Sequence, residues 1–280
     1  MMRRIAALAF ALLAALSTVP SGAQENFFQG WENRVRSTVS KQPGWVVPVL
    51  TPSSGLVQLA RFDAYRQITP THTITWNIDG GKGINLIPWY NTELDINMPP
   101  LIEHNNSKVA DGAGDVSVLL KYRFLAAPDQ EGSYSLSAGI AATAPSGSYK
   151  NGAPGGSVSP TVYMGKGFHR FDVQTAASIS LPTSFTSSMG RPVAWNTAFQ
   201  YKLGKSFWPE VEANSTFYRG GANNGKEQVF LTPGLMFSRL KLMKAPKNRL
   251  ALIMGAGDQI AVTHFHTYNH ALVLTTRISF

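Results

Sequence analysis

The sequence lacks cysteine altogether and carries little charge. None of its 280 residues is a cysteine, and Asp, Glu, Lys and Arg together make up only 15%. Without thiols the chain forms neither disulfides nor structural thiolate metal sites, although an exported protein would be free to use disulfides. A charged fraction this low is unusual for a soluble protein, and it fits a β-barrel, in which apolar and polar residues alternate.

Long hydrophobic runs are also scarce, and the one present lies at the N-terminus. Arg3 and Arg4 precede an apolar stretch at 5–16, and small residues at 17–23 follow it. These three parts predict a secretory signal peptide at 1–23, cleaved before Gln24. The stretch is too short for a transmembrane helix, which needs about 20 apolar residues.

Alternating hydrophobicity dominates the rest of the chain. In residues 115–124, for example, Val118, Leu120 and Tyr122 share one parity while Lys121 and Arg123 share the other. A period of two over about ten residues indicates strands long enough to cross a bilayer. We expect about twelve, near 56–66, 71–78, 84–97, 114–125, 132–143, 156–165, 169–181, 190–203, 207–218, 227–240, 248–262 and 267–280.

The last ten residues favour a membrane barrel over a soluble β-sandwich. Leu272, Leu274, Ile278 and the terminal Phe280 share one parity, and Arg277 lies on the other. This pattern resembles the C-terminal assembly signal of bacterial outer-membrane proteins, and Phe280 is its expected key residue. The fold class we predict is all-β: a transmembrane antiparallel up-and-down β-barrel of about twelve strands at 54–280. A periplasmic or secreted sandwich is the alternative.

The connections between the expected strands differ in length. Those after even-numbered strands, such as 79–83 and 165–168, are shorter than most of those after odd-numbered strands, such as 98–113 and 144–155. Because extracellular loops of such barrels exceed the periplasmic turns, both chain ends are expected in the periplasm. Residues 80–83, Gly-Gly-Lys-Gly, are interpreted as a hairpin turn.

Residues 24–53 precede the first clear strand. Phe27, Trp31 and Val35 recur at helical spacing within 26–40. The segment could form an amphipathic helix that plugs the lumen, a helix against the periplasmic rim, or a disordered leader. The sequence leaves these three possibilities open.

A family resemblance begins at residues 111–124. A Gly-x-Gly-Asp sequence (Gly112 to Asp115) enters a strand ending Lys-Tyr-Arg-Phe, and Pro-Ser-Gly follows at 145–147. We interpret Gly112 and Gly114 as providing backbone angles closed to other residues, and Asp115 as facing the lumen. The motifs resemble the MetA-pathway of phenol degradation family of outer-membrane barrels, although Pro-Ser-Gly replaces the usual Pro-Thr-Gly. The resemblance spans 55–280 and implies passage of small hydrophobic or aromatic compounds.

One strand parity gathers the charged residues expected to line the lumen. Mixed signs in an enclosed space predict either salt bridges that fill the barrel or a lining that tunes permeation. Glu210 and Glu212, which share a strand face, are the first choice for a functional role. The candidates are Asp115, Lys121, Arg123, Arg170, Asp172, Lys202, Glu210, Glu212 and Arg277.

Catalytic and metal chemistry have little support in the sequence. His264, His266 and His270 form the one histidine cluster, a conceivable divalent-metal site, but loop histidines are more often solvated. There is no Gly-x-Ser-x-Gly pattern, and His72 and His169 are isolated. We expect no enzyme, no cofactor and no bound metal.

The predicted function is an outer-membrane channel or transporter, with passive uptake of small hydrophobic or aromatic solutes. The alternatives are a non-conducting structural or ligand-binding barrel with a packed charged lumen, and an outer-membrane lipid-modifying enzyme. The net charge of +9 is scattered along the chain, so nucleic acid is not an expected partner. The expected partners are outer-membrane lipids and lipopolysaccharide, the outer-membrane assembly machinery and an unidentified solute.

Overall fold

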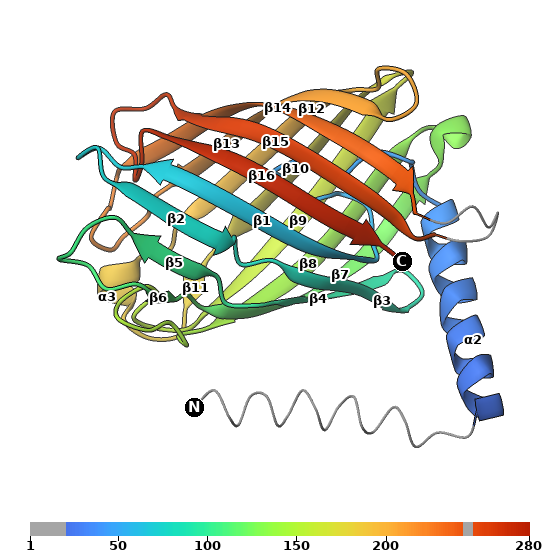
Figure 1. Ribbon diagram of the computed structural model, residues 1–280, viewed down its shortest axis with the longest axis horizontal. Helices are drawn as coiled ribbons and strands as arrows, with labels where there is room; N and C mark the ends of the chain where they lie inside the picture. The colour runs from blue at the N-terminus through green and yellow to red at the C-terminus, as the bar shows by residue number, and fades with distance from the viewer. Residues whose placement is uncertain (1–20, 243–248) are drawn as a thin grey trace.

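The computed structural model describes residues 21–242 and 249–280, so most of the predicted signal peptide lies outside the described residues. Within them, an N-terminal helix precedes a closed β-barrel (Figure 1). The helices are α2 (Ser21–Ser40), a 3₁₀ turn at Asp129–Glu131 and the short α3 (Thr186–Met189). No described helix is long and apolar enough to cross a membrane.

The strands alternate in direction around the barrel. They are β1 (Leu59–Ile68), β2 (Ile74–Asp79), β3 (Gly83–Trp89), β4 (Thr92–Asn97), β5 (Leu101–His104), β6 (Gly112–Ala113), β7 (Val116–Ala127), β8 (Tyr134–Ala144), β9 (Ser157–Phe168), β10 (Phe171–Ile179), β11 (Leu181–Pro182), β12 (Val193–Tyr201), β13 (Phe207–Phe217), β14 (Glu227–Lys241), β15 (Ala251–Ala261) and β16 (His270–Ser279).

Twelve strands form the closed wall among the described residues, in agreement with the predicted fold class. Their order is β1-β3-β4-β7-β8-β9-β10-β12-β13-β14-β15-β16. The barrel closes where β16 pairs with β1, from Leu59 opposite Ser279 to Ile68 opposite His270. Closure removes the unpaired sheet edges that a bilayer would not tolerate.

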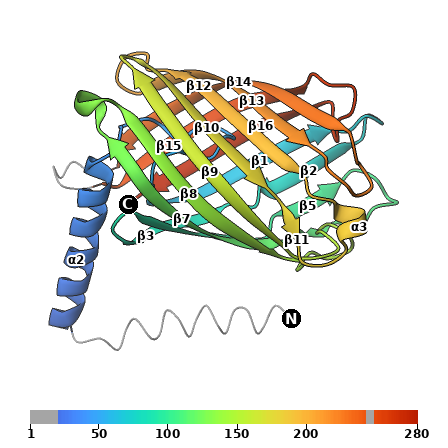
Figure 2. The ribbon, with the colours of Figure 1, turned by 180° about the vertical axis from the view of Figure 1, so that it is seen from behind.

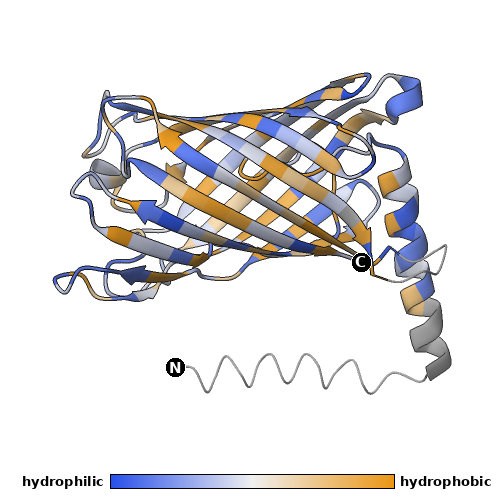
Figure 3. Ribbon diagram, turned by 45° about the horizontal axis from the view of Figure 1, so that its top comes forward, coloured by the Kyte–Doolittle hydropathy of each residue, from blue (hydrophilic) through white to orange (hydrophobic). Residues whose placement is uncertain are grey.

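The outer face of the wall is apolar and the inner face polar. On β16, Leu272, Leu274 and Ile278 are exposed on the outside, whereas Thr275 and Arg277 are buried inside. Figure 3 shows hydrophobic residues recurring along the wall. An outward apolar band on a closed barrel is the arrangement that a lipid environment requires.

The two barrel strands after β1, which are β3 and β4, differ from the sequence prediction. Residues 84–97 are not one strand, because Tyr90 and Asn91 form a tight turn between β3 and β4, with Asn91 in a left-handed conformation (φ 56°). The hydrophobic alternation of residues 84–97 continues through these two residues, so the sequence pattern gives no sign of the turn. The prediction of a single strand there was wrong.

The interpretation of residues 80–83 as a hairpin turn was also wrong. Strands β2 and β3 both pair with β1, so they are two halves of one barrel position joined by a kink at 80–82. Asp79, Gly80 and Gly81 all have positive φ there. Strand β5 likewise continues β4 after Met98-Pro99-Pro100, where proline removes ladder donors. Backbone hydrogen bonds from Met98 to Lys82 and from Gly114 to Pro100 connect the interrupted strands.

The glycines of the Gly-x-Gly-Asp motif serve close packing rather than unusual backbone angles, which corrects our interpretation. Neither Gly112 nor Gly114 is among the positive-φ residues. A Cβ on Gly112 would lie 2.4 Å from the Ser148 hydroxyl, and one on Gly114 would lie 2.8 Å from the Pro100 ring. A side chain at Gly112 would push against the loop between β8 and β9, and one at Gly114 would push against the junction of β4 and β5.

Candidate functional site

The lumen contains an irregular stretch of chain, residues 41–58, which we call the plug segment. It follows α2 at one end of the barrel and runs inside the wall before β1 begins (Figure 1). Val46, Val49, Thr51, Ser54 and Leu56 in this segment are all buried. Buried backbone without regular structure needs hydrogen-bond partners from elsewhere, because unpaired N–H and C=O groups are strongly unfavourable.

Two glutamates of β13 accept hydrogen bonds from three successive N–H groups of the plug segment. Glu210 Oε1 accepts from Val49 N at 2.8 Å. The two oxygens of Glu212 accept from Leu50 N at 2.7 Å and Thr51 N at 2.5 Å. Hydrogen bonds to carboxylates are stronger than neutral ones, so this carboxylate pair is a main attachment point of the plug.

Two arginines hold the adjoining carbonyl groups. Arg277 of β16 is fully buried and donates to the carbonyls of Val47, Pro48 and Val49, with 2.6 Å to Pro48 O. Arg61 of β1 also donates to Val49 O, at 2.5 Å. Residues 47–51 are therefore held through their N–H groups by one part of the wall and through their carbonyls by another.

The remainder of the plug segment is held by the opposite wall. Lys121 Nζ on β7 donates to the carbonyls of Ser53 and Gly55, both at 2.6 Å. Arg123 donates to Thr38 O at the end of α2 (2.9 Å) and to the Gln42 side chain (2.5 Å). These contacts fix the point at which the chain passes from the helix into the lumen.

Uncharged side chains complete the attachment. Ser135 and Ser137 of β8 both donate to Ser54 O, at 3.0 and 2.8 Å. Gln174 of β10 donates to Val46 O at 3.0 Å, and Glu93 of β4 accepts from Val57 N. Nearly every side of the barrel thus contributes a partner for the plug backbone.

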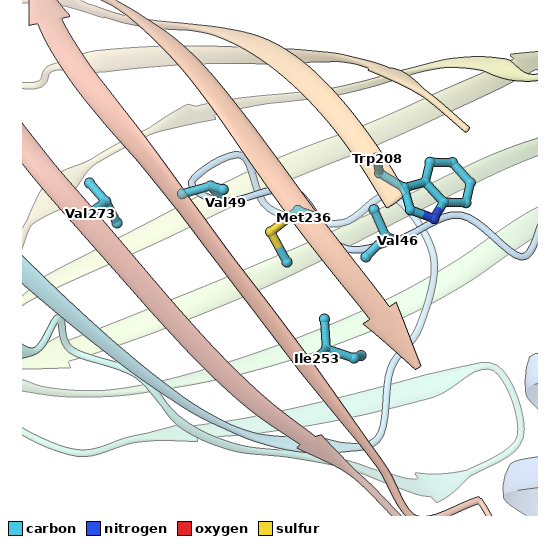
Figure 4. Packing of buried hydrophobic residues seen from close by; sticks show 6 residues of the cluster. All are labelled: Val46, Val49, Trp208, Met236, Ile253 and Val273. Carbon is cyan, nitrogen blue, oxygen red and sulfur yellow. The ribbon is translucent and has the colours of Figure 1, made fainter. Parts of the chain in front are cut away.

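Apolar contacts stabilise the same segment on one side. Figure 4 shows Val46 and Val49 of the plug among inward-facing wall residues. These wall residues come from four neighbouring strands and are Trp208, Met236, Ile253 and Val273. Because they are buried with the plug in place, its departure would open an apolar patch to the lumen.

The lumen charges bind the plug backbone more than they bind one another. Inside the barrel, the described residues form two direct ion pairs: Arg61–Asp63 at 2.6 Å and Lys121–Glu93 at 3.9 Å. Of the two uses that the sequence left open, a filling network of salt bridges therefore accounts for only a few charges. Most of the others bind the backbone of the plug segment instead.

The structure brings together five of the nine predicted lumen residues around the plug segment: Lys121, Arg123, Glu210, Glu212 and Arg277. Asp172 is buried beside Gln174, at 3.3 Å, but does not contact the plug segment through any described hydrogen bond.

Three predicted residues lie elsewhere. Asp115 accepts from the backbone N–H groups of Gly147 and Ala153 at 2.9 and 2.7 Å, so it organises the loop between β8 and β9 rather than lining the lumen. Arg170 is exposed in the turn between β9 and β10. Lys202 lies in the turn after β12, with its ammonium 5.6 Å from the Trp208 ring centroid.

The sequence prediction missed Ser135, Ser137 and Gln174 as partners of the plug. All three are uncharged, so a search for charged lumen residues passes over them. Their signal was their position: two serines spaced by two on β8 face the same interior as Lys121 and Arg123 on the neighbouring strand.

The histidine cluster is dispersed into separate contacts. Both ring nitrogens of His266 are hydrogen-bonded, to Thr263 O and the Asn269 side chain, each at 2.9 Å. His270 lies 3.4 Å from Asp258, and His264 is exposed. Within residues 21–242 and 249–280 there is no group of three or more potential metal ligands.

A cavity of about 450 Å³ remains at the mouth of the barrel beside α2, between the plug segment and strands β14–β16. Its walls are mainly apolar and include Trp45, Val46, Leu56, Leu59 and Ile253, with Arg36 and Lys241 among the few charged groups. The plug segment therefore does not fill the end of the barrel beside α2.

Comparison with known proteins places this geometry in context. No curated protein matches the sequence. The fold is similar to an outer membrane channel from Pseudomonas putida F1, with 14% identity over 84% of this chain and 100% of that one and a TM-score of 0.54. It is also similar to the NanC porin, with 10% identity over 79% and 98% of the two chains and a TM-score of 0.50.

A family model supplies the remaining comparison. The model described as "Putative MetA-pathway of phenol degradation" matches residues 35–241, a range that begins within α2, includes the whole plug segment and ends with β14. The matched range therefore contains Lys121, Arg123, Glu210 and Glu212, four of the five predicted residues that hold the plug. The chain belongs to this family.

Proposed function

We propose that the chain is an outer-membrane channel that is closed at rest by its plug segment and that passes small hydrophobic or aromatic solutes when the segment moves. Its outward apolar band and closed sheet support a bilayer location, and the N-terminal export signal expected from the sequence supports the outer membrane of a bacterium. Its surroundings would be phospholipid and lipopolysaccharide.

One observation carries the channel proposal: a chain segment, rather than the side chains of the wall, occupies the lumen. A purely structural barrel can fill its interior with its own side chains. Here the wall instead presents carboxylates, guanidinium groups and hydroxyls to the backbone of residues 46–57. Contacts of this kind can be exchanged for water, so the segment can leave without unfolding the wall.

The class of solute is supported by the apolar surfaces around the plug. The mouth cavity is mainly apolar, and withdrawal of the plug would expose Trp208, Met236, Ile253 and Val273 beside it. Membership of a family described by phenol degradation points to the same chemistry. An enzymatic role has no comparable support, because the similar structures are channels and the described histidines lie in loops and turns or at a strand end.

Planar-bilayer recording of the purified protein with and without residues 24–53 tests the proposal. The full chain should show a small conductance, and removal of the segment should raise it by roughly an order of magnitude, because a twelve-stranded barrel is wide enough for an aqueous lumen once emptied. Silence of both forms, with folding verified by heat-modifiable gel mobility, would contradict the channel.

Entry of N-phenyl-1-naphthylamine tests the class of solute. Intact lipopolysaccharide excludes this aromatic dye, which fluoresces once it reaches lipid. Cells that express the full chain should take it up faster than cells without the chain, while uptake of a hydrophilic sugar of similar size should change little. Equal acceleration of both would indicate a general pore.

The terminal Phe280 is proposed to be read by the outer-membrane assembly machinery. Its ring is exposed at the end of β16, and its backbone pairs with Gln58 through Phe280 N to Gln58 O and Gln58 Nε2 to Phe280 O. We expect deletion of Phe280 to abolish most of the heat-modifiable barrel in outer-membrane fractions, whereas Phe280→Tyr, which keeps an aromatic ring, assembles. Normal insertion of the truncated chain would refute this role.

A further inference from the structure

Helix α2 extends past the barrel that it closes off. Figures 1 and 2 show it running across the end of the barrel, transverse to the long axis, with its N-terminal turns reaching beyond the wall. If the barrel crosses a membrane along that axis, as the proposed function holds, α2 lies in the plane of the membrane surface. The inference below rests on that orientation.

The apolar face of α2 is continuous, but the protein covers only its C-terminal half. Val35 is buried against Leu56 and Ile87, and Trp31 and Val39 pack on the same cluster. Phe27 and Trp31 are spaced by four residues, as are Trp31 and Val35, so they lie along one side of the helix. The face that holds α2 to the barrel therefore continues outward past it.

Beyond Trp31, the two phenylalanines at 27 and 28 are left open. Phe27 and Phe28 are 54% and 52% exposed, although they pack edge-on with centroids 5.6 Å apart and Phe27 lies 6.0 Å from Trp31. Two adjacent exposed phenylalanines on a short helix form a patch that water does not favour. Something apolar is needed to cover it.

The patch is continuous with the lipid-facing wall. Phe27, Phe28 and Trp31 line a concave corner of about 410 Å³ together with Val35 and Phe280 and with three polar residues, Glu32, Gln58 and Arg249. Phe280 ends the outward parity of β16, the face whose residues Leu272, Leu274 and Ile278 are exposed on the outer wall. The corner thus lies where the outer wall of the barrel meets α2.

The charges of α2 are balanced, with Glu25 and Glu32 against Arg34 and Arg36, and the basic residues lie toward its C-terminal end. Arg34 lies 5.2 Å from the Trp31 ring centroid, Arg36 pairs with Glu32 at 2.6 Å, and Lys41 directly follows the helix. Basic residues beside an aromatic face are typical of helices that lie in a membrane interface. Aromatic rings favour the same depth.

We infer that Phe27 and Phe28, beside the wall-packed Trp31, insert into the periplasmic leaflet of the outer membrane, so that α2 is an interfacial anchor that binds phospholipid. The anchor fixes the start of the plug segment, because Arg123 joins Thr38 O to the wall only a few residues before the chain enters the lumen. A lipid-bound α2 would keep the base of the plug at the mouth while its inner part moves.

Spin labels on single cysteines test the inference, because the chain has no native cysteine. Labels would replace Phe28 on the proposed lipid face, Asn33 on the opposite face and Leu274 on the outer wall, in full-length protein reconstituted into phosphatidylethanolamine–phosphatidylglycerol vesicles. Collisions with oxygen report lipid, and collisions with a water-soluble nickel chelate report water. A separate variant carries the label at position 27 and keeps Phe28. Agreement between the two variants shows that neither substitution has disturbed the helix.

We expect the labels at 27 and 28 to resemble the label at 274, with a several-fold higher oxygen-to-nickel accessibility ratio than the label at 33. Nickel access at 27 and 28 equal to that at 33 would overturn the inference. Protection of 27 and 28 from both reagents would also overturn it, because a protein would then cover the patch. If the label at 274 is also accessible to the nickel chelate, the membrane barrel itself is refuted. If the label at 274 reports lipid while the label at 28 reports water, only the anchor is refuted.

Discussion

Glu212→Ala is expected to release the plug and raise the time-averaged conductance of the channel. Glu212 accepts hydrogen bonds from Leu50 N and Thr51 N and is fully buried. Each hydrogen bond to a charged group contributes about 1.5–3 kcal/mol, so the loss of two weakens the closed state by about 3 kcal/mol or more. With a tenfold change for every 1.4 kcal/mol or so, the open-to-closed ratio should rise by roughly a hundredfold.

A matched variant separates this effect from a general loss of negative charge. Glu227→Ala removes an exposed carboxylate at the first residue of β14, remote in the fold from the plug attachments, and should leave the conductance unchanged. Single-channel recording of both variants in the same lipid supplies the comparison. An unchanged open probability in Glu212→Ala would mean that the β13 carboxylates do not hold the gate.

Cross-linking the plug to the wall should reverse the opening. The side chains of Thr51 in the plug and Asn214 on β13 meet at 3.4 Å, and no native thiol competes with cysteines placed there. In the Glu212→Ala background, Thr51→Cys with Asn214→Cys should close the channel when a short bis-methanethiosulfonate joins the two thiols. Reduction of the linker should restore the high conductance within the same recording.

Each single-cysteine variant serves as a control, because one thiol can be modified but cannot form the bridge. If modification of a single cysteine closes the channel equally, the effect is steric blockage rather than tethering. If the bridged protein still conducts as before, the solute path does not require movement of residues around Thr51, and the gate must lie elsewhere.

The wall was largely predictable from the sequence, because its physical cause is local. A strand with one face toward lipid repeats its hydrophobicity every second residue, so Leu272, Leu274 and Ile278 identify the outer face of β16 without reference to other strands. The same rule placed Lys121 and Arg123 on the lumen-facing side of β7. The twelve-strand count followed from repeating this test along the chain.

The test failed where turns do not interrupt the alternation. The tight turn at Tyr90 and Asn91 lies within an apolar stretch, so residues 84–97 resembled one strand, and the glycines at 80 and 81 resembled a hairpin. Glycine with positive φ permits a kink within one barrel position as readily as a reversal between two. Only the pairing partners, which are distant in sequence, distinguish them.

The plug segment was not predicted in this form, because it has no period of its own: the sequence left open a helix that plugs the lumen, a helix against the rim or a disordered leader, and not an irregular segment inside the barrel. Its conformation is set by groups far along the chain: Glu210 and Arg277 lie more than a hundred residues from the backbone they hold. The helix at its start was easier, since Phe27, Trp31 and Val35 carry the helical spacing themselves. The helical spacing alone did not show that this helix would contact the barrel.

The pairing of β1 with β16 has a consequence for the order of events during biogenesis. Leu59 meets Ser279, so the ring cannot be completed until the final residues have been synthesised and delivered, and the entropy of closing so long a loop opposes that step. The residues that occupy the interior precede every wall strand in the sequence, whereas Arg277, which binds them, lies on the final strand. The strand that closes the ring therefore also binds the segment inside it, and that contact favours the closed ring.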